Sequence, residues 1–543
     1  MSRPSDLFKE GRREELWRQC CGFIDLSLDE FMGVQKQLLL EQIELLKKCE
    51  LGREIMQGLS PRSVEEFRAT VPLTTYDDYA PHLLKRRPNG LPHKPVVWQY
   101  TSGKSGEYAY RWVPVTGRQL DQVEPLMYAL IMFSTCRGRG DIDVGGRRKA
   151  LYAMAPPPYA TGTLMRVLTE SLDFLPETNE AENMEFEARI KKGFDLALND
   201  GFDLCLALSS VAVAIGDRVG GHSGRTNLRP LIKRPRALAR LAKAKLISKL
   251  ARRPMMPKDL WSVKGLMTYG IDSSIYRDRI RTMWGREPLE FHGCTEALII
   301  ATQTWDYDTM TFVPNLNFFE FIPEAESIRA RLDPTYKPAT CLLDEVVPGN
   351  YELVITSFHG GPFVRYKLGH LVQITARRND RLNIDIPQMV FLTRVDDQID
   401  IAGFTRLSEK IIWQAIENSG IKYVDWTARK EVRDRPVLSL YVELANGFDG
   451  SLRHIGDLIH SELKKLDAPY AELEAYTGLH PMEVTLLPRG SFSAFKARQQ
   501  AAGADLEQLR PPHINPSDGV LRFLLGPQPV EATPATDREK VEA

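Results

Sequence analysis

The most informative stretch of the sequence is Gln99-Tyr100-Thr101-Ser102-Gly103-Lys104-Ser105-Gly106, which follows the hydrophobic run Pro95-Val96-Val97-Trp98. Small residues let the backbone approach a ligand closely, and N–H and O–H groups then face phosphate oxygens. Gly103-Lys104-Ser105 matches the end of a P-loop, but that motif also needs a glycine where this chain has Trp98. The stretch is therefore not a P-loop, and it is either another phosphate-binding loop or a surface turn.

The composition is that of a large soluble protein. The 543 residues are enough for more than one domain, and 43% of them are hydrophobic. The formal net charge is zero, which argues against attraction of the whole protein to nucleic acid or to an anionic membrane, although a local patch can still exist.

The sequence also bears on the cellular compartment. The seven cysteines form no C-x-x-C pair, and their odd number suits reduced thiols better than a disulfide framework or a zinc site. Residues 1–17 are charged and lack an apolar signal segment, and no run is long enough to span a bilayer. We therefore expect a cytoplasmic protein.

The pattern of hydrophobic residues changes along the chain. It is helical over residues 28–59, and after Pro72 strand-like segments alternate with helical ones such as residues 117–133. This alternation predicts a three-layer α/β core. Short strands follow one another over residues 311–392 and predict a β-rich subdomain.

A second domain is expected after the polar segment Val395-Asp396-Asp397. Helical patterns at residues 408–418 and 455–466 alternate there with strand patterns at residues 437–443 and 482–487. We therefore expect a large N-terminal domain over residues 1–395 and a smaller, mobile α+β domain over residues 396–525. Residues 526–543 are rich in Pro, Glu, Ala and Thr and are expected to be disordered.

Residues 218–258 contain thirteen Lys or Arg residues and no acid. Leu238, Leu241, Ile247 and Leu250 give this stretch a partly amphipathic helical pattern. Binding to a membrane surface or to nucleic acid is one interpretation. The other, which we favour here because no aromatic residue is interleaved to stack on bases, is a solvated basic face or an anion-facing wall of a cleft.

Four segments, far apart in the sequence, carry the residue types that ATP-dependent activation of a carboxylate requires. The loop at residues 101–106 would hold the β- and γ-phosphates. In His292-Gly293-Cys294-Thr295-Glu296 a ring could stack on adenine, a hydroxyl could contact the α-phosphate and a carboxylate could hold Mg²⁺. Residues 365–370 offer a polar group for the ribose, and residues 393–399 are followed by Arg406.

Each segment alone has an ordinary structural explanation. A packed histidine would account for His292, a surface carboxylate for Glu296, and a solvated turn with a weak salt bridge for Arg394 and Asp396. The order and spacing of the four segments together carry the specificity.

In this order the segments resemble the adenylate-forming superfamily, which includes acyl-CoA ligases, luciferases and peptide-synthetase adenylation domains. Within it, residues 38–513 most resemble the auxin-responsive acyl acid amido synthetase family. Residues 71–78 resemble its V-P-x-x-T-Y-x-D motif, and residues 101–106 its S-S-G-T-S-G motif. Further matches are residues 314–315 with 319–323, residues 363–370, residues 490–492 and residues 503–512.

The resemblance implies an ATP-dependent ligase with two half-reactions. A carboxylate reacts with Mg-ATP to give an acyl-adenylate and pyrophosphate, and an amine, such as that of an amino acid, or a thiol then displaces AMP. The smaller domain is expected to rotate about a hinge at Asp396 between the two steps. Arg510, Glu296 and Thr295 are the expected catalytic residues, with Glu296 as the Mg²⁺ ligand. The expected nucleotide-binding residues are Thr101, Ser102, Gly103, Lys104, Ser105, Gly106, His292, Gly293, His370, Arg394 and Arg406.

Three positions depart from the family pattern. The ribose-binding aspartate falls on His370, which cannot accept two hydrogen bonds as a carboxylate does. The C-terminal lysine falls on Arg510, which keeps the charge but differs in shape and reach. Lys104 replaces a threonine of the phosphate loop, and Lys496 is the nearest lysine upstream of Arg510.

Three functions therefore stay open. An amide-forming acyl-acid ligase comes first. An acyl-CoA ligase is the second, because residues 394–399 look more like the hinge of CoA ligases. A weak or inactive nucleotide-binding relative is the third, because of His370 and Arg510. Tyr159, Met267 and Tyr269 are candidates for the acid pocket; the partners expected are a small carboxylic acid and an amine or CoA, without nucleic acid, and the oligomeric state is not predicted.

Overall fold

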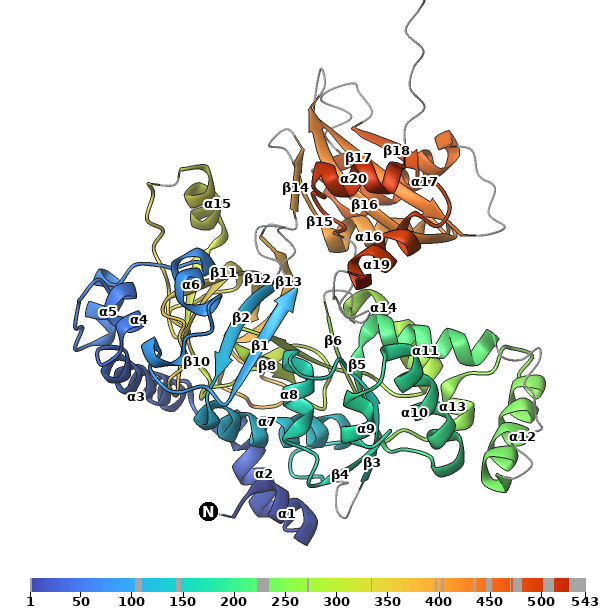
Figure 1. Cartoon of the computed structure of the whole chain (residues 1–543), viewed down its shortest axis with the longest axis horizontal. Helices are drawn as coiled ribbons and strands as arrows, with labels where there is room; N and C mark the ends of the chain where they lie inside the picture. Colours follow the sequence, from blue (N-terminus) through green and yellow to red (C-terminus); the bar gives the residue numbers. More distant parts are fainter. Residues whose placement is uncertain are drawn as a thin grey trace, which may run out of the picture. The chain divides into compact units, whose positions relative to one another are not determined.

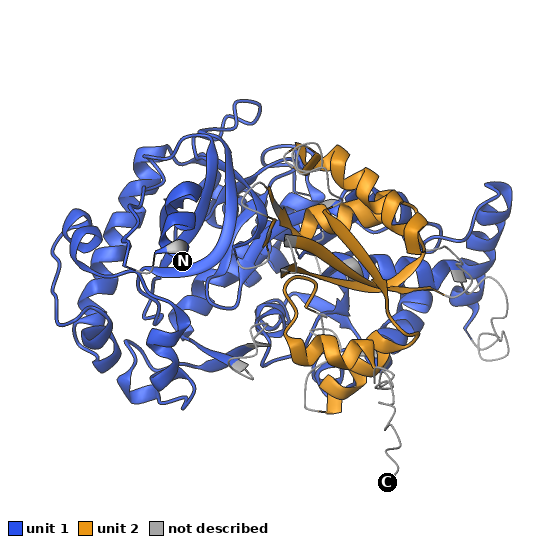
Figure 2. Ribbon diagram, turned by 90° about the horizontal axis from the view of Figure 1, so that it is seen from above, with its two compact units in different colours: residues 1–396 blue, residues 397–543 orange. Residues whose placement is uncertain are grey.

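The structure is a computed structural model that describes residues 2–102, 110–142, 148–221, 234–270, 273–333, 335–395, 398–401, 405–432, 436–445, 452–468, 470–471, 481–501 and 512–526. Contacts within the chain divide it into two compact units, Met1–Asp396 and Asp397–Ala543, which Figure 2 draws in two colours. The predicted tail lies outside the described residues, apart from Gly526.

The first unit is built around an eleven-stranded sheet in the order β10-β11-β12-β13-β9-β8-β7-β6-β5-β3-β4 (Figure 1). From β4 to β7 neighbouring strands run parallel, and from β7 to β10 they run antiparallel. The strands are β3 (Arg148–Ala153), β4 (Leu172–Leu175), β5 (Leu204–Leu208), β6 (Gly265–Tyr269), β7 (Leu289–Cys294), β8 (Leu298–Gln303), β9 (Met310–Phe312), β10 (Asn317–Pro323), β11 (Gly349–Ser357), β12 (Tyr366–Ala376) and β13 (Gln388–Arg394).

Most helices of this unit precede the sheet or connect its parallel strands, because parallel neighbours need crossover connections, whereas α15 (Glu324–Leu332) lies between the antiparallel neighbours β10 and β11. The helices are α1 (Pro4–Glu10), α2 (Arg13–Cys21), α3 (Leu28–Leu46), α4 (Glu50–Ile55), α5 (Val64–Thr70), α6 (Tyr76–Leu83), α7 (Gly117–Thr135), α8 (Ala160–Arg166), α9 (Thr178–Glu182), α10 (Phe186–Asp200), α11 (Ser209–Gly221), α12 (Pro235–Leu250), α13 (Pro257–Leu260), α14 (Ser273–Trp284) and α15, with 3-10 turns at Gly22–Asp25 and Pro88–Gly90.

The parallel half of the sheet has helices on both faces. Along β3, Ala150 and Tyr152 belong to one hydrophobic core, which includes residues of α7, while Leu151 and Ala153 belong to a second core with residues of α10, α11 and α14. Successive side chains of a strand point to opposite faces, so β3 lies between two helical layers. This arrangement confirms the predicted α/β fold class, and the strands of residues 311–392 prove to be the antiparallel continuation of the same sheet.

A separate two-stranded hairpin carries the glycine-rich stretch. β1 (Val97–Ser102) pairs with β2 (Tyr110–Val115), and Thr101 lies opposite Arg111 in the antiparallel register. The hairpin is attached to the unit where Tyr100 N donates a hydrogen bond to Pro158 O at 3.3 Å. Gly103, Lys104, Ser105 and Gly106 lie outside the described residues.

The second unit has its own sheet and core. β16 (Tyr423–Val432) pairs antiparallel with β17 (Pro436–Leu444), which pairs parallel with β18 (Met482–Leu486). The other elements are the hairpin β14 (Gln398–Ile401) and β15 (Thr405–Ser408), and the helices α16 (Glu409–Asn418), α17 (Leu452–Leu466), α19 (Ser491–Ala501) and α20 (Asp518–Leu525). The smaller α+β domain is therefore present as predicted. Among the described residues, no helix is both long enough and apolar enough to cross a membrane.

A buried ion pair joins the antiparallel half of the sheet to the N-terminal helices. Arg365 donates two hydrogen bonds to the Glu320 carboxylate, at 2.8 and 3.0 Å, and two more to the backbone oxygens of Arg68 and Val71 at 2.6 Å. The side chains of Arg365 and Glu320 are only 7% and 1% exposed. Arg365 was part of a segment expected at the ribose, but here its side chain holds the fold together.

Replacing Glu320 by glutamine is expected to lower the free energy of unfolding by about 3–5 kcal/mol, because it leaves the buried guanidinium uncompensated. Asp217→Asn is the matched control, since Asp217 pairs with Arg279 and both side chains are about half exposed, at 52% and 46%. An exposed pair contributes about 1 kcal/mol or less. Urea unfolding of the whole protein measures both changes, and equal small shifts in the midpoint would contradict the expectation.

Candidate active site

Two histidines from separate strands meet in the first unit. His292 Nε2, at the end of β7, lies 3.1 Å from His370 Nδ1 on β12, and both residues are buried. The ring of Phe391 on β13 stacks on His292 at 4.5 Å and 22° and meets His370 edge to face at 5.4 Å. Three rings from three strands therefore form one cluster, in which both histidines are buried and Phe391 is partly buried.

Strand curvature brings these residues together. In the sheet order, β13, β9 and β8 lie between β12 and β7, yet the rings of His370 and His292 touch. The register shifts between His292 and Gly293, and a Cβ on Gly293 would lie 2.2 Å from the backbone oxygen of Leu298. Glycine is thus required where β7 bends into the turn that carries Thr295 and Glu296.

Both imidazoles are neutral at pH 7. Burial lowers the pKa of His292 to about 4. Burial, the neighbouring His292 and the charge of Arg394 hold the pKa of His370 well below its usual value. A neutral imidazole carries one N–H donor and one acceptor nitrogen, so the pair can share a single hydrogen bond, and Nε2 is the ring nitrogen of His370 left for a ligand.

Charged groups surround this cluster. Arg394 lies directly opposite His370 in the β12–β13 register. Glu296 is partly exposed in the turn after β7, and it raises the pKa of Cys294 and of Tyr366 in addition to the larger effect of burial. The Cys294 thiol therefore stays protonated and cannot serve as a nucleophile at neutral pH.

The β1–β2 hairpin ends near the same place. The charge of Arg111 acts on the phenol of Tyr366 and lowers its pKa, although burial and Glu296 together raise it. Arg111 lies opposite Thr101 in the hairpin, and the Tyr366 phenol experiences the charges of both Arg111 and Glu296. Thr101 and Ser102 belong to β1, but only their backbone is described.

A magnesium ion would have Glu296 as its protein ligand. No group of three His, Cys, Asp or Glu side chains that could hold a metal occurs among the described residues. This fits Mg²⁺, which proteins usually bind through one or two carboxylates together with substrate phosphates and water.

Several predicted residues belong to the second unit or its boundary. Asp396 and Arg510 lie outside the described residues, and Arg406 is on β15 with only its backbone described. Lys496 is on α19, and its ammonium lies 3.5 Å from Asp425 Oδ2. This pairing gives Lys496 a structural partner within the second unit.

His513, three residues after Arg510, makes several contacts within the second unit. Its Nδ1 lies 2.7 Å from Glu409 Oε1, its Nε2 lies 2.8 Å from Asp425 Oδ1, and its ring stacks on Trp426 at 4.4 Å and 7°. Burial opposes the charged form, but the two carboxylates outweigh it and raise the pKa of His513 to about 9.

Two of the three candidates for the acid pocket, Met267 and Tyr269, lie on β6, and the third, Tyr159, directly precedes α8. Tyr159 is buried and meets Tyr100 at 4.7 Å, Met267 is buried on β6, and Tyr269 meets Phe291 at 5.6 Å. Phe291 directly precedes His292, so Tyr269 connects this apolar region to the histidine cluster.

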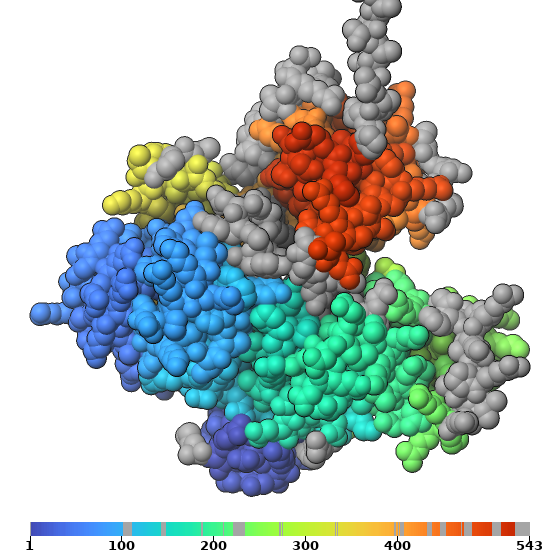
Figure 3. Space-filling model, viewed as in Figure 1, coloured from blue at the N-terminus to red at the C-terminus, as the bar shows by residue number. Residues whose placement is uncertain are grey.

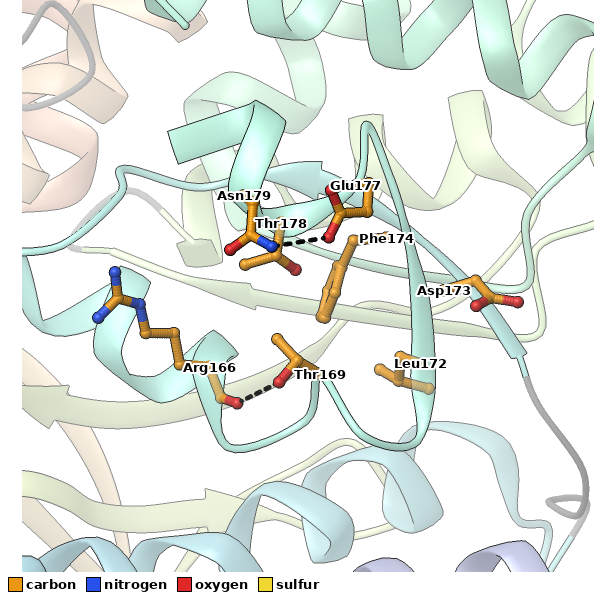
Figure 4. A pocket seen from close by; sticks show the side chains of 8 residues that line it. All are labelled: Arg166, Thr169, Leu172, Asp173, Phe174, Glu177, Thr178 and Asn179. Atoms are coloured by element: carbon orange, nitrogen blue, oxygen red, sulfur yellow. Dashed lines mark hydrogen bonds between the residues drawn. The ribbon is translucent and has the colours of Figure 1, made fainter. Parts of the chain in front are cut away.

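A different cavity of about 600 Å³ opens beside β4 (Figure 4). Residues of β4, α8, α9 and their connections line it: Arg166, Thr169, Leu172, Asp173, Phe174, Glu177, Thr178 and Asn179. β3, β5 and β6 lie between β4 and β7 in the sheet, so this cavity is not part of the histidine cluster.

Sequence reasoning missed three residues of the site. Phe391 contacts His292 and His370, Tyr366 experiences the charge of Glu296, and Arg111 acts in turn on Tyr366. Arg111 could have been found from the hairpin pattern, because a turn places it opposite Thr101. The stacking of Phe391 on His292 had no local signal.

The chain is similar in sequence to known proteins. Three family models match successive parts of the chain: the GH3 family N-terminal domain at residues 21–161, its central domain at residues 310–394 and its C-terminal domain at residues 409–518. Together they cover more than half of the chain.

The curated relatives share only about a quarter of the aligned residues with this chain. A jasmonoyl-L-amino acid synthetase of Nicotiana attenuata is 25% identical over 279 residues, which are 48% of this chain and 46% of that protein. A probable indole-3-acetic acid-amido synthetase of Oryza sativa subsp. japonica is 24% identical over 39% of this chain and 38% of that protein. The matches thus span less than half the length of these relatives.

Solved structures show the same fold over nearly the whole chain. An acyl acid amido synthetase in complex with 2,4-DB superposes with a TM-score of 0.64 at 17% identity, covering 93% of this chain and 95% of that one. A 2-hydroxyisobutyryl-CoA ligase in its postadenylation state superposes with a TM-score of 0.57 at 13% identity, covering 91% and 90%. At these identities the likeness is one of fold.

The charge of His513 predicts how the second unit responds to pH. The pKa of His513 in the folded protein, about 9, lies above the ordinary histidine value. Its contribution to the free energy of unfolding is therefore fully present below about pH 6.5 and is lost as the pH rises through about 9. The loss is on the order of 3 kcal/mol. Urea unfolding of the whole protein between about pH 7 and pH 10 measures it.

His513→Asn serves as the reference for that experiment. The variant is less stable at pH 7, but the part of the pH dependence that comes from residue 513 is gone, whereas other titrating groups act on both proteins alike. If the free energies of unfolding of the two proteins changed with pH in parallel, His513 would not be charged in the folded state.

Proposed function

The chain belongs to the GH3 family, and from that premise we propose that it is an ATP-dependent ligase that activates a carboxylic acid as an acyl-adenylate and transfers the acyl group to an amine. One observation carries the proposal. His292, Glu296, His370 and Arg394, which are far apart in the sequence, converge beside the end of the hairpin that bears the Thr101–Gly106 stretch.

The proposed acceptor is an amino acid. Relatives matched by sequence include synthetases named for jasmonoyl-L-amino acids and for indole-3-acetic acid amides, and a ligase named for 4-substituted benzoates and glutamate. Each name pairs a carboxylic acid, or its acyl group, with an amide or an amino acid. We place the reaction in the cytoplasm, where the seven free cysteines would remain reduced.

In the first half-reaction, a carboxylate oxygen of the acid forms a bond to the α-phosphorus of ATP while the bond to pyrophosphate breaks. Negative charge on the phosphate oxygens must be stabilised by groups already in position. We assign this task to Arg394 and to the hydroxyl of Thr295, with Arg510 supplied by the second unit. Glu296 would hold Mg²⁺, which neutralises phosphate charge when bound.

The histidine cluster is assigned to the nucleoside. Phe391 occupies one face of the His292 ring, so an adenine would use the other face. His370 Nε2 would make one hydrogen bond to a ribose hydroxyl, where a carboxylate could accept two. The proposed site thus binds the ribose with fewer hydrogen bonds than the family pattern.

In the second half-reaction, the amine nitrogen forms a bond to the acyl carbon while the bond to AMP breaks, and the nitrogen loses a proton. The Cys294 thiol is not needed as a covalent carrier, in agreement with its raised pKa. The main contribution of the protein is to position the two reactants.

Carboxylate-dependent exchange of pyrophosphate into ATP is the expected activity of the purified protein, tested with a broad panel of acids. Glu296→Gln should lower the exchange rate about 100-fold by weakening the proposed metal site. Glu10→Gln, with a side chain that is 57% exposed, makes the same charge change on the surface and should leave the rate unchanged. A folded wild-type protein that exchanges with no acid would instead be the inactive nucleotide-binding relative.

The acceptor is tested by AMP release. An acyl-CoA ligase is the second candidate, because residues 394–399 resemble the hinge of CoA ligases. With ATP and an active acid, we expect a mixture of amino acids to stimulate AMP release and to give an amide, identified by its mass. Stimulation by CoA alone, with a thioester as product, would replace the amide proposal.

A further inference from the structure

The outer face of α12 combines leucines with positive charge. Ala237, Leu241 and Ala244 are buried against the rest of the first unit, where α12 contacts α10 and α13. On the outer side, Leu238, Leu246 and Leu250 are 39%, 59% and 76% exposed. With Ala242 they follow one another at four-residue steps, which places them along one side of a helix.

Basic side chains flank these leucines. Arg236, Lys243, Lys245 and Lys249 are exposed, and none of the four forms an ion pair with another described residue. No acid occurs between Asp217 and Asp259 in the sequence. A helix of 16 residues is about 24 Å long, so this face is a compact positive surface with apolar side chains in it.

We propose that the outer face of α12 docks the protein on the surface of an anionic lipid bilayer. Lysine and arginine are attracted to anionic headgroups, while the leucines enter the boundary between headgroups and acyl chains. The helix would lie in the plane of the interface and would not cross the bilayer. This explains exposed leucines that a solvated basic face would not need.

Other anionic partners explain the face less well. Proteins that bind single-stranded nucleic acid offer aromatic rings for the bases to stack on, and no Phe, Tyr or Trp occurs within residues 218–258. A protein interface concentrates its energy in a central cluster of large side chains, usually with Trp, Tyr or Arg. On α12 the leucines alternate with lysines, which suits a lipid interface better.

The proposal is independent of the candidate active site. α12 lies between the parts of the chain matched by the N-terminal and central family models, which end at residue 161 and begin at residue 310. None of the proposed catalytic or nucleotide-binding residues is on it. In the space-filling view, the green residues of this region lie along an outer margin of the first unit (Figure 3).

Vesicle sedimentation of the full-length protein tests the proposal. At low salt we expect binding to vesicles of phosphatidylcholine with phosphatidylglycerol and none to phosphatidylcholine alone, with weaker binding as salt rises. The triple variant K243Q, K245Q, K249Q should weaken binding on the order of 100-fold, since each lysine near an anionic surface contributes about fivefold. The double variant L246Q, L250Q should also weaken it, because it removes the apolar contribution.

Matched variants separate docking from general charge effects. K48Q, K85Q, K422Q removes three exposed lysines elsewhere, and L40Q, L84Q removes two leucines that are 39% and 38% exposed; both should bind as the wild type does. Failure to bind anionic vesicles, equal binding to neutral ones, or insensitivity to the α12 leucine variant would overturn the proposal. Tighter binding to a single-stranded oligonucleotide than to anionic vesicles would overturn it in favour of nucleic acid.

Discussion

The hydrogen bond between His292 and His370 is the contact on which the site depends. It joins two strands, β7 and β12, that are separated by three others in the sheet order, where the parallel half of the sheet becomes antiparallel. Arg394 is carried into place because it lies opposite His370, and Glu296 because it follows His292 in the next turn. If His292 and His370 did not meet, the four side chains would lie apart at the ends of separate strands.

The pair also gives meaning to the departure from the family pattern at His370. A carboxylate buried at this position would need a charged partner or several donors. A neutral histidine instead finds its partner in His292, and both rings pack on Phe391. The two histidines therefore form a pair with its own buried hydrogen bond, and in the proposed site this pair replaces the ribose-binding carboxylate of the family pattern.

Local patterns account for what could be predicted from the sequence. The hydrophobic periodicities predicted the alternating α/β core and the smaller α+β unit, and the separated motifs predicted which strand ends carry polar groups. Contacts between distant residues leave no such pattern. His292 and His370 are 78 residues apart, and the burial of the Arg365 side chain against Glu320 likewise joins residues that are 45 positions apart.

The two units bury histidines in opposite protonation states, and the groups beside each histidine determine whether it is charged. Among the residues that the structure describes, no carboxylate pairs with His292 or His370, so burial dominates and both stay neutral. His513 is buried as deeply, but Asp425 and Glu409 hold it charged. In the proposed reaction, the first unit thus offers neutral rings to the nucleoside, while the second unit uses a buried charge to fix the chain three residues beyond Arg510.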